Sequence, residues 1–290
     1  MLKLMKIDAP EITQASLQEL RHELHKLVGT QFVSLSLPQV AIQAFEPSQI
    51  GTIVGSLMDA LIPHLTDIPQ VGLSKHAGIL GEREGYPDYI HRSGIRVELK
   101  LLYIDNPQLK MKRPPTKREP SARLTQKVTV KNVVPGTDAL LIVGYQLQPH
   151  KTMLDAVTPT IIELEVFSVI ELIRARDDRL TRKGGRWFGN YETPCVLSKI
   201  GRAKVRRGEP VSTASYGRKE SEGKDYNEDT NFGKLARIPH PQMQAFLLHC
   251  VSRGVGYEVD AMVEEGEHLN LDGELPALLS ELQRDKLSNQ

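Results

Sequence analysis

Residues 81–103, GEREGYPDYIHRSGIRVELKLLY, decide how the centre of this chain folds. Apolar and polar residues alternate from 95 to 101, which predicts a strand with one buried face. Glu98 and Lys100 then share the opposite face of that strand. A second run with strand character, residues 86–91, precedes it, so the sequence predicts a β-hairpin.

The turn of this hairpin determines where Asp88 points. A two-residue turn at Ser93-Gly94 would pair residue 88 with residue 99 and place Asp88 on the face opposite Glu98. A three-residue loop, with Gly94 in the left-handed conformation, pairs 91 with 95 and 88 with 98. Glycine at the last loop position favours this second register. We therefore expect the two carboxylates to lie side by side.

Pro87-Asp88, nine further residues and then Glu98-Leu99-Lys100 form a pattern that resembles the PD-(D/E)xK nuclease superfamily, best known from type II restriction endonucleases. The αβββαβ core of that family implies a helix and another strand after the hairpin. Residues 121–133 and the apolar run 139–146 are the candidates.

The expected fold is therefore α/β, a central mixed β-sheet flanked by helices in the restriction-endonuclease-like manner, with a loop-rich basic insertion. We expect a single endonuclease domain over residues 1–290. Its catalytic core covers about 70–175 and its DNA-recognition region about 176–238.

The resemblance implies Asp88, Glu98 and Lys100 as catalytic residues. It also implies that Asp88, Glu98 and the Leu99 carbonyl hold Mg²⁺, a hard cation that prefers oxygen ligands. Lys100 would hydrogen-bond the attacking water or the scissile phosphate. The alternative is a surface hairpin whose Asp, Glu and Lys form only a weak ion pair.

A further acidic metal ligand stays open. Glu82 or Glu84 precedes the motif, and Glu19 or Glu23 lies on an expected N-terminal helix, where similar enzymes often place an acid. A solvated loop is the preferred explanation for Glu82 and Glu84, whereas a solvated helix face explains Glu19 and Glu23 equally well.

Other helices follow from apolar residues at helical spacing. They are expected over about 17–27, 47–62, 167–179, 241–252 and 276–286. Residues 160–166 alternate strictly, which predicts a half-buried strand.

Basic residues cluster in two stretches, although the net charge is only +1. Residues 101–127 carry seven Lys and Arg against two acids, and residues 174–207 carry eleven against three. Clustered Lys and Arg suit a polyanion, while solvated faces are the alternative. The candidate DNA-binding residues are Lys117, Arg118, Arg123, Gln126, Lys127, Arg182, Lys183, Arg186 and Arg202. Trp187 either stacks on bases or anchors the core.

The composition excludes several classes of protein. The chain has 290 residues, 40% of them apolar and 25% charged, which is typical of a folded globular protein. There is no apolar run long enough for a membrane span, and the N-terminus does not resemble a signal peptide. Two cysteines exclude a disulfide framework, so we expect a cytoplasmic protein. Neither zinc-binding spacing nor a phosphate-binding loop occurs, so no nucleotide cofactor is expected.

We therefore expect a type II restriction endonuclease, a Mg²⁺-dependent hydrolase of double-stranded DNA at a specific sequence, acting as a homodimer. The alternatives are a DNA repair or recombination nuclease of the same superfamily and a non-catalytic DNA-binding protein. The sequence leaves open the recognition sequence, the cut position and the choice between dimer and tetramer.

Overall fold

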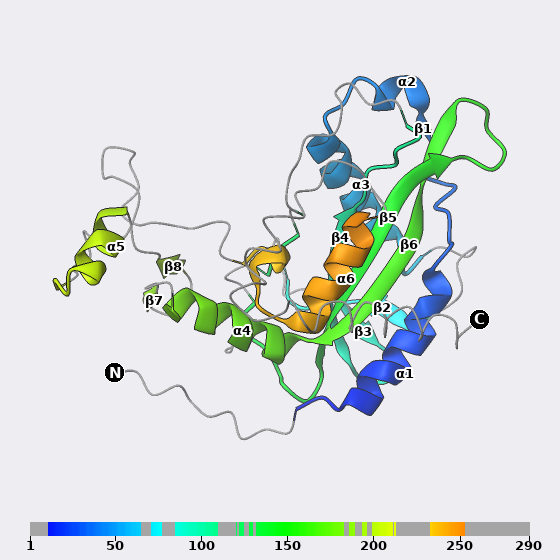
Figure 1. Ribbon diagram of the computed structural model, residues 1–290. Coiled ribbons are helices and arrows are strands. Elements are labelled where there is room, and N and C mark those ends of the chain that lie inside the picture. The colour runs from blue at the N-terminus through cyan, green and yellow to red at the C-terminus, as the bar shows by residue number, and fades with distance from the viewer. Residues whose placement is uncertain are drawn as a thin grey trace.

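The computed structural model describes residues 11–64, 71–76, 85–109, 120, 122–124, 128–129, 132–182, 186–188, 193–195, 199–210, 212 and 233–252. Its centre is a mixed sheet of six strands in the order β1-β6-β5-β4-β3-β2 (Figure 1). The strands are β1 Leu37–Pro38, β2 Leu73–Lys75, β3 Tyr89–His91, β4 Arg96–Tyr103, β5 Asp138–Pro149 and β6 Ala156–Ser168. Only β4 and β5 pair in parallel; the other neighbours are antiparallel. The α/β class with a central mixed sheet is therefore confirmed.

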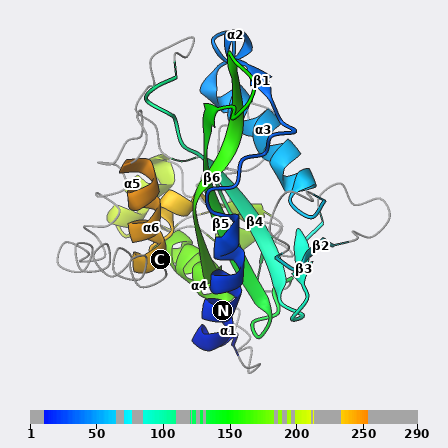
Figure 2. The same cartoon turned by 90° about the vertical axis from the view of Figure 1, so that its right-hand side faces the viewer.

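Helices cover both faces of this sheet and define two hydrophobic clusters. The first cluster joins Val97 and Leu99 of β4 to α1 (Gln14–Leu24) and α3 (Pro47–Leu61). The second joins Leu102 of β4 to α4 (Val169–Arg182) and α6 (Pro241–Ser252). Figure 2 shows α4 and α6 on one side of the sheet and α3 on the other.

Alternation along β4 assigns its side chains to these two layers. Val97 and Leu99 belong to the α1–α3 layer, whereas Leu102 belongs to the α4–α6 layer. Glu98 and Lys100 have the same parity as Leu102, so they point to the α4–α6 layer.

The hairpin register expected from the sequence is confirmed. Tyr89 pairs with Val97, and the His91 N–H donates to the Ile95 carbonyl over 2.8 Å. Gly94 has φ +86°, the left-handed conformation that the three-residue loop requires. Residue 88 therefore lies opposite residue 98.

The expected N-terminal, 47–62, 167–179 and 241–252 helices are present as α1, α3, α4 and α6. Thr13 caps α1, because its side chain accepts from the Ser16 N–H over 3.1 Å. A short helix, α2 (Gln39–Ile42), and two 3₁₀ turns, His25–Leu27 and Leu235–Arg237, complete these layers. The expected helix over 276–286 lies outside the described residues.

The helix expected over 121–133 is wrong for the residues described there. Arg123 forms an isolated antiparallel bridge to Lys234, and the Leu124 N–H donates to the Gly233 carbonyl over 2.8 Å. The β-branched residues of this stretch, which include Val128 and Thr129, have low helix propensity. Leu124 and Val128 instead pack in the second cluster.

The half-buried strand expected over 160–166 is also different. β6 is buried along its whole length, because helices cover both of its faces. Its two glutamates are buried beside partners: Glu163 lies 3.3 Å from His249 Nε2, and Glu165 lies 2.9 Å from Arg21 Nε.

The loop-rich basic region contains more regular structure than the sequence indicated. It holds a two-stranded sheet of β7 (Arg186–Phe188) and β8 (Thr193–Cys195), followed by α5 (Lys199–Arg206). Figure 1 shows these elements beyond the end of α4. Among the described helices, none has the length and apolar character to cross a bilayer.

Candidate active site

The β3–β4 hairpin brings Asp88, Glu98 and Lys100 together on the α4–α6 face. The Leu99 N–H donates to Asp88 Oδ2 over 2.7 Å, which ties the carboxylate to the neighbouring strand. Lys100 Nζ lies 2.5 Å from Glu98 Oε1 and donates to the Leu99 carbonyl over 3.1 Å. All four groups named by the sequence motif therefore lie within one connected arrangement.

The electrostatics of this pair are those of two carboxylates in a confined space. The pKa of Glu98 is raised to about 7, because burial and, to a smaller extent, the negative charge of Asp88 raise it more than Lys100 lowers it. Burial also raises the pKa of Asp88, against the lowering effects of Lys100 and of the Leu99 N–H. A divalent cation beside the two carboxyl groups would stabilise their ionised forms, which burial disfavours.

The arrangement fits a hard divalent cation. Glu98 Oε2 is buried and has no hydrogen-bond partner, which is costly for a carboxylate oxygen unless a cation or water satisfies it. Mg²⁺ is commonly held by one or two carboxylates and several waters, so Asp88, Glu98 and the Leu99 carbonyl suffice. Within the described residues, no group of three or more His, Cys, Asp or Glu is placed to hold a metal.

Lys100 touches two of the oxygens that would hold the cation. Its ammonium contacts Glu98 Oε1 and the Leu99 carbonyl. A metal bound to these oxygens would therefore repel the ammonium of Lys100. A substrate phosphate would then be the favourable partner for Lys100.

A second charged group lies at the outer edge of the hairpin. Lys75 on β2 forms an ion pair of 2.6 Å with Asp59 of α3 and sits 4.3 Å from the centre of the Tyr89 ring. Tyr89 in turn donates to Asp59 Oδ1 over 2.5 Å. The negative charge of Asp59 contributes to the raised pKa of Asp88.

A polar network centred on the buried Asp138 was not anticipated. Tyr86 Oη donates to Asp138 Oδ2 over 2.6 Å, and Arg96 Nε lies 3.4 Å from Asp138 Oδ1. Asp138 is fully buried at the start of β5. The signal in the sequence was an acid directly before the apolar run ALLIVGYQ. A charge at the start of a buried strand is costly unless a partner pairs with it.

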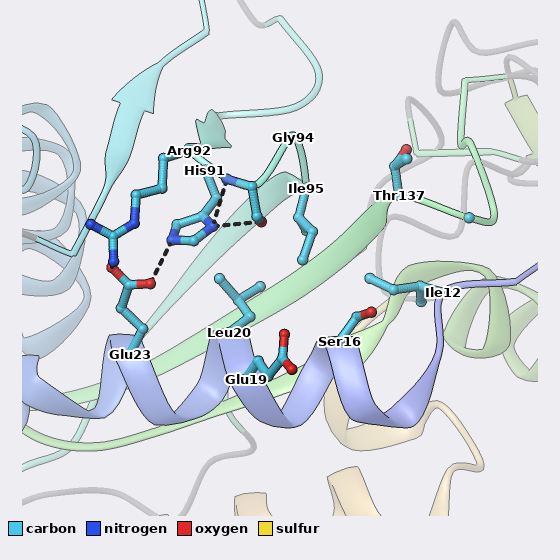
Figure 3. Close-up of a pocket in the computed structure, with 12 residues that line it drawn as sticks. Ile12, Ser16, Glu19, Leu20, Glu23, His91, Arg92, Gly94, Ile95 and Thr137 are labelled. Atoms are coloured by element: carbon cyan, nitrogen blue, oxygen red, sulfur yellow. Dashed lines mark hydrogen bonds and ion pairs between the residues drawn. The ribbon is translucent and has the colours of Figure 1, made fainter.

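The acids of the N-terminal helix face away from this site. Glu23 pairs with His91 Nε2 at 3.2 Å and with Arg92 at 2.6 Å, on the α1 side of the sheet. Glu19 and Glu23 line a cavity of about 600 Å³ between α1 and the hairpin loop (Figure 3). Neither joins Asp88 and Glu98, while Glu82 and Glu84 lie outside the described residues.

The cavity also contains a short polar relay. His91 Nδ1 accepts from the Ser93 N–H over 3.2 Å, and His91 Nε2 lies 3.2 Å from Glu23 Oε2. Figure 3 shows this relay between the loop and α1. It fastens the hairpin to α1 on the face opposite the acids.

The structure describes only some of the candidate DNA-binding residues. Arg123 takes part in the bridge to Lys234. Arg182 ends α4, Arg186 begins β7 and Arg202 lies in α5. Those outside the described residues are Lys117, Arg118, Gln126, Lys127 and Lys183. Leu124 and Val128 belong to the hydrophobic cluster on the α4–α6 side of the sheet, which is the side of Glu98.

Comparison with models of known protein families gives no match. Comparisons with curated proteins and with solved structures give no match either.

Proposed function

We propose that this protein is a Mg²⁺-dependent nuclease that cleaves double-stranded DNA at a specific sequence, in the manner of type II restriction endonucleases. The observation that carries the proposal is the hairpin register, which places Asp88 opposite Glu98 with Lys100 on the same face. This register depends on the left-handed conformation of Gly94. The alternative, a two-residue turn, would have placed the two acids on opposite faces of the sheet.

The strand arrangement supports the same proposal. An antiparallel hairpin, β3–β4, carries the acids, and the next strand, β5, pairs with β4 in parallel. The resemblance to the PD-(D/E)xK superfamily implies that a further strand follows the hairpin, and β5 has that place in the chain. The helix expected between β4 and β5 is missing from the described part of that connection, so the agreement concerns the strands alone.

Each residue has a defined task in phosphodiester hydrolysis. Asp88, Glu98 and the Leu99 carbonyl hold Mg²⁺, which when bound lowers the pKa of a coordinated water and offsets charge on the phosphate. The Leu99 N–H keeps Asp88 oriented toward Glu98. Lys100 donates to the attacking water or to the scissile phosphate as negative charge develops there.

Specific cleavage of duplex DNA is the part of the proposal that rests on the resemblance and on the basic segments. Arg186 begins β7 and Arg202 lies in α5, and we include both among the residues proposed to contact DNA. Since both strands of a duplex must be cut, two copies of the chain act together.

Incubation of plasmid DNA with the protein and Mg²⁺ tests the proposal. Discrete fragments are expected, and they should vanish with a chelator or with Glu98→Gln. Glu46→Gln is the matched control, because it makes the same isosteric change at the start of α3 and keeps a capping oxygen. A smear would indicate a repair or recombination nuclease, and binding without cutting would indicate a non-catalytic DNA-binding protein.

A further inference from the structure

Asp138 is joined to both chain segments that carry the candidate acids. Its Oδ2 accepts from Tyr86 Oη over 2.6 Å, and its Oδ1 lies 3.4 Å from Arg96 Nε. Tyr86 stands two residues before Asp88, and Arg96 stands two residues before Glu98. The buried carboxylate of Asp138 therefore contacts a residue two positions before each of the two acids.

Asp138 itself is fixed from several directions. Its Oδ2 accepts from the Val134 N–H, and its Oδ1 accepts from Thr137 Oγ1, each over 3.0 Å. Arg96 is its direct neighbour across the parallel β4–β5 pairing. A fully buried carboxylate with this many donors has one orientation, so it can serve as a rigid reference point.

The two residues that Asp138 holds also contact each other. The Arg96 guanidinium lies 5.3 Å from the centre of the Tyr86 ring, and it donates to the Asn132 carbonyl over 3.3 Å. Tyr86 is near enough to Glu98 that this carboxylate helps to raise the pKa of the tyrosine. The network therefore lies directly against the candidate metal site.

We propose that Asp138 is a positioning residue, which acts through Tyr86 and Arg96 to hold Asp88 and Glu98 at the separation that a single shared cation requires. The inference rests on the proposed function, since it assigns a role toward the same site. A carboxylate that merely satisfied the start of β5 would need Val134 and Thr137 but not the tyrosine hydroxyl.

Tyr86→Phe isolates the contact. It deletes one hydroxyl, keeps the ring against Arg96 and leaves Asp138 Oδ2 with the Val134 N–H. Tyr145→Phe is the matched control, because it also deletes a tyrosine hydroxyl, here one that donates to the Gly51 carbonyl over 3.2 Å in the α1–α3 layer. Arg96→Lys is a second variant, which keeps the charge but loses the planar fork.

The first measurement uses the metal-free protein. The Leu99 N–H donates to Asp88, so its amide proton shift in an NMR spectrum reports where that carboxylate stands. We expect Tyr86→Phe and Arg96→Lys to shift this resonance and Tyr145→Phe to leave it unchanged. The second measurement is the Mg²⁺ concentration for half-maximal DNA cleavage, which should rise about tenfold in the first two variants while the rate at saturating Mg²⁺ changes little.

The two measurements separate the outcomes. If Tyr86→Phe and Arg96→Lys behave like Tyr145→Phe in both, the positioning role of Asp138 is overturned. A loss of rate that saturating Mg²⁺ does not restore also overturns it, because misplacement of the metal ligands is then not the defect. If the Leu99 resonance shifts as expected while even the unmodified protein cuts no DNA, the positioning stands and the nuclease function fails.

Discussion

At the residue scale, Glu98 is the group whose chemistry is most strongly set by its surroundings. Its carboxylate is buried, one oxygen has no hydrogen-bond partner, and its pKa is raised to about 7. The sequence predicted that Glu98 and Lys100 would both face solvent, and for Glu98 this is wrong, since only 6% of the residue is exposed. Alternation of polar and apolar residues along a strand shows which side chains share a face. It does not show whether other parts of the protein bury that face.

The stability of the metal-free protein should depend on this proton. The folded chain keeps Glu98 protonated up to about pH 7, whereas the unfolded chain releases the proton near pH 4.3. The free energy of unfolding therefore falls as the pH rises through this interval, by roughly 1–3 kcal/mol. Denaturant unfolding measured from pH 4 to pH 8 checks the slope. Glu98→Gln should flatten it, and an unchanged slope in that variant would contradict the assignment.

The same proton should compete with the metal. At low Mg²⁺, cleavage should rise with pH through about 7 as Glu98 ionises. Raising the Mg²⁺ concentration should move the midpoint of this profile to lower pH, because the cation favours the carboxylate form. Rate profiles at several Mg²⁺ concentrations test this, and a midpoint independent of Mg²⁺ would speak against Glu98 as a ligand.

Lys100 should matter for chemistry more than for folding. Its side chain lies at the edge of the buried pair, with 20% exposure. Lys100→Met removes the charge that assists the transition state, so the cleavage rate should fall at least 100-fold, while thermal unfolding and DNA binding change little. Normal turnover in Lys100→Met would remove Lys100 from the mechanism.

At the element scale, the loop of the β3–β4 hairpin determines whether a site exists. Gly94→Ala places a side chain at φ +86°, where it meets no atom within 4 Å, so the cost is conformational alone. We expect a loss of about 1 kcal/mol in the free energy of unfolding, and a smaller loss for Gly94→Asn.

Gly29→Ala is the control for that change. Gly29 has φ +85° and equally open surroundings, but it follows the helical segment that leads out of α1 rather than the hairpin. Both alanine variants should lose similar stability, while only Gly94→Ala should impair cleavage. Equal cleavage by the two would show that the hairpin register tolerates another loop.

Some of these helices and strands could be predicted from the sequence and others could not. Local patterns sufficed for α1, α3 and the hairpin, because the information lies within a few residues of each. The segment around Arg123 and Leu124 was misassigned because its partner, Gly233–Lys234, lies far along the chain. The partners of Asp138 could not be predicted for the same reason. Tyr86 and Arg96 reach Asp138 only when β5 pairs with β4.

At the scale of the whole molecule, the proposed cleavage of both DNA strands requires more than one copy of the chain. We expect sedimentation on a duplex that contains the recognition site to show two chains per site. Binding should weaken steeply with salt, since many Lys and Arg contacts release counterions from DNA. A single chain per duplex that nicks one strand would favour a nicking or repair enzyme. The strongly acidic residues 258–274, which should lie away from DNA, fall outside the described residues.

The parallel pairing of β4 with β5 has a consequence for the order in which the molecule matures. A hairpin such as β3–β4 closes from neighbouring residues within microseconds. The contact of Arg96 with Asp138 must wait until the long connection between β4 and β5 has been closed, which is the slower and entropically costlier event. Asp88 and Glu98 therefore come together early, when the hairpin closes. The contact with Asp138 that is proposed to position them forms later. A newly made chain would acquire the proposed nuclease activity only once β4 and β5 have paired, so that activity would report the formation of this part of the sheet.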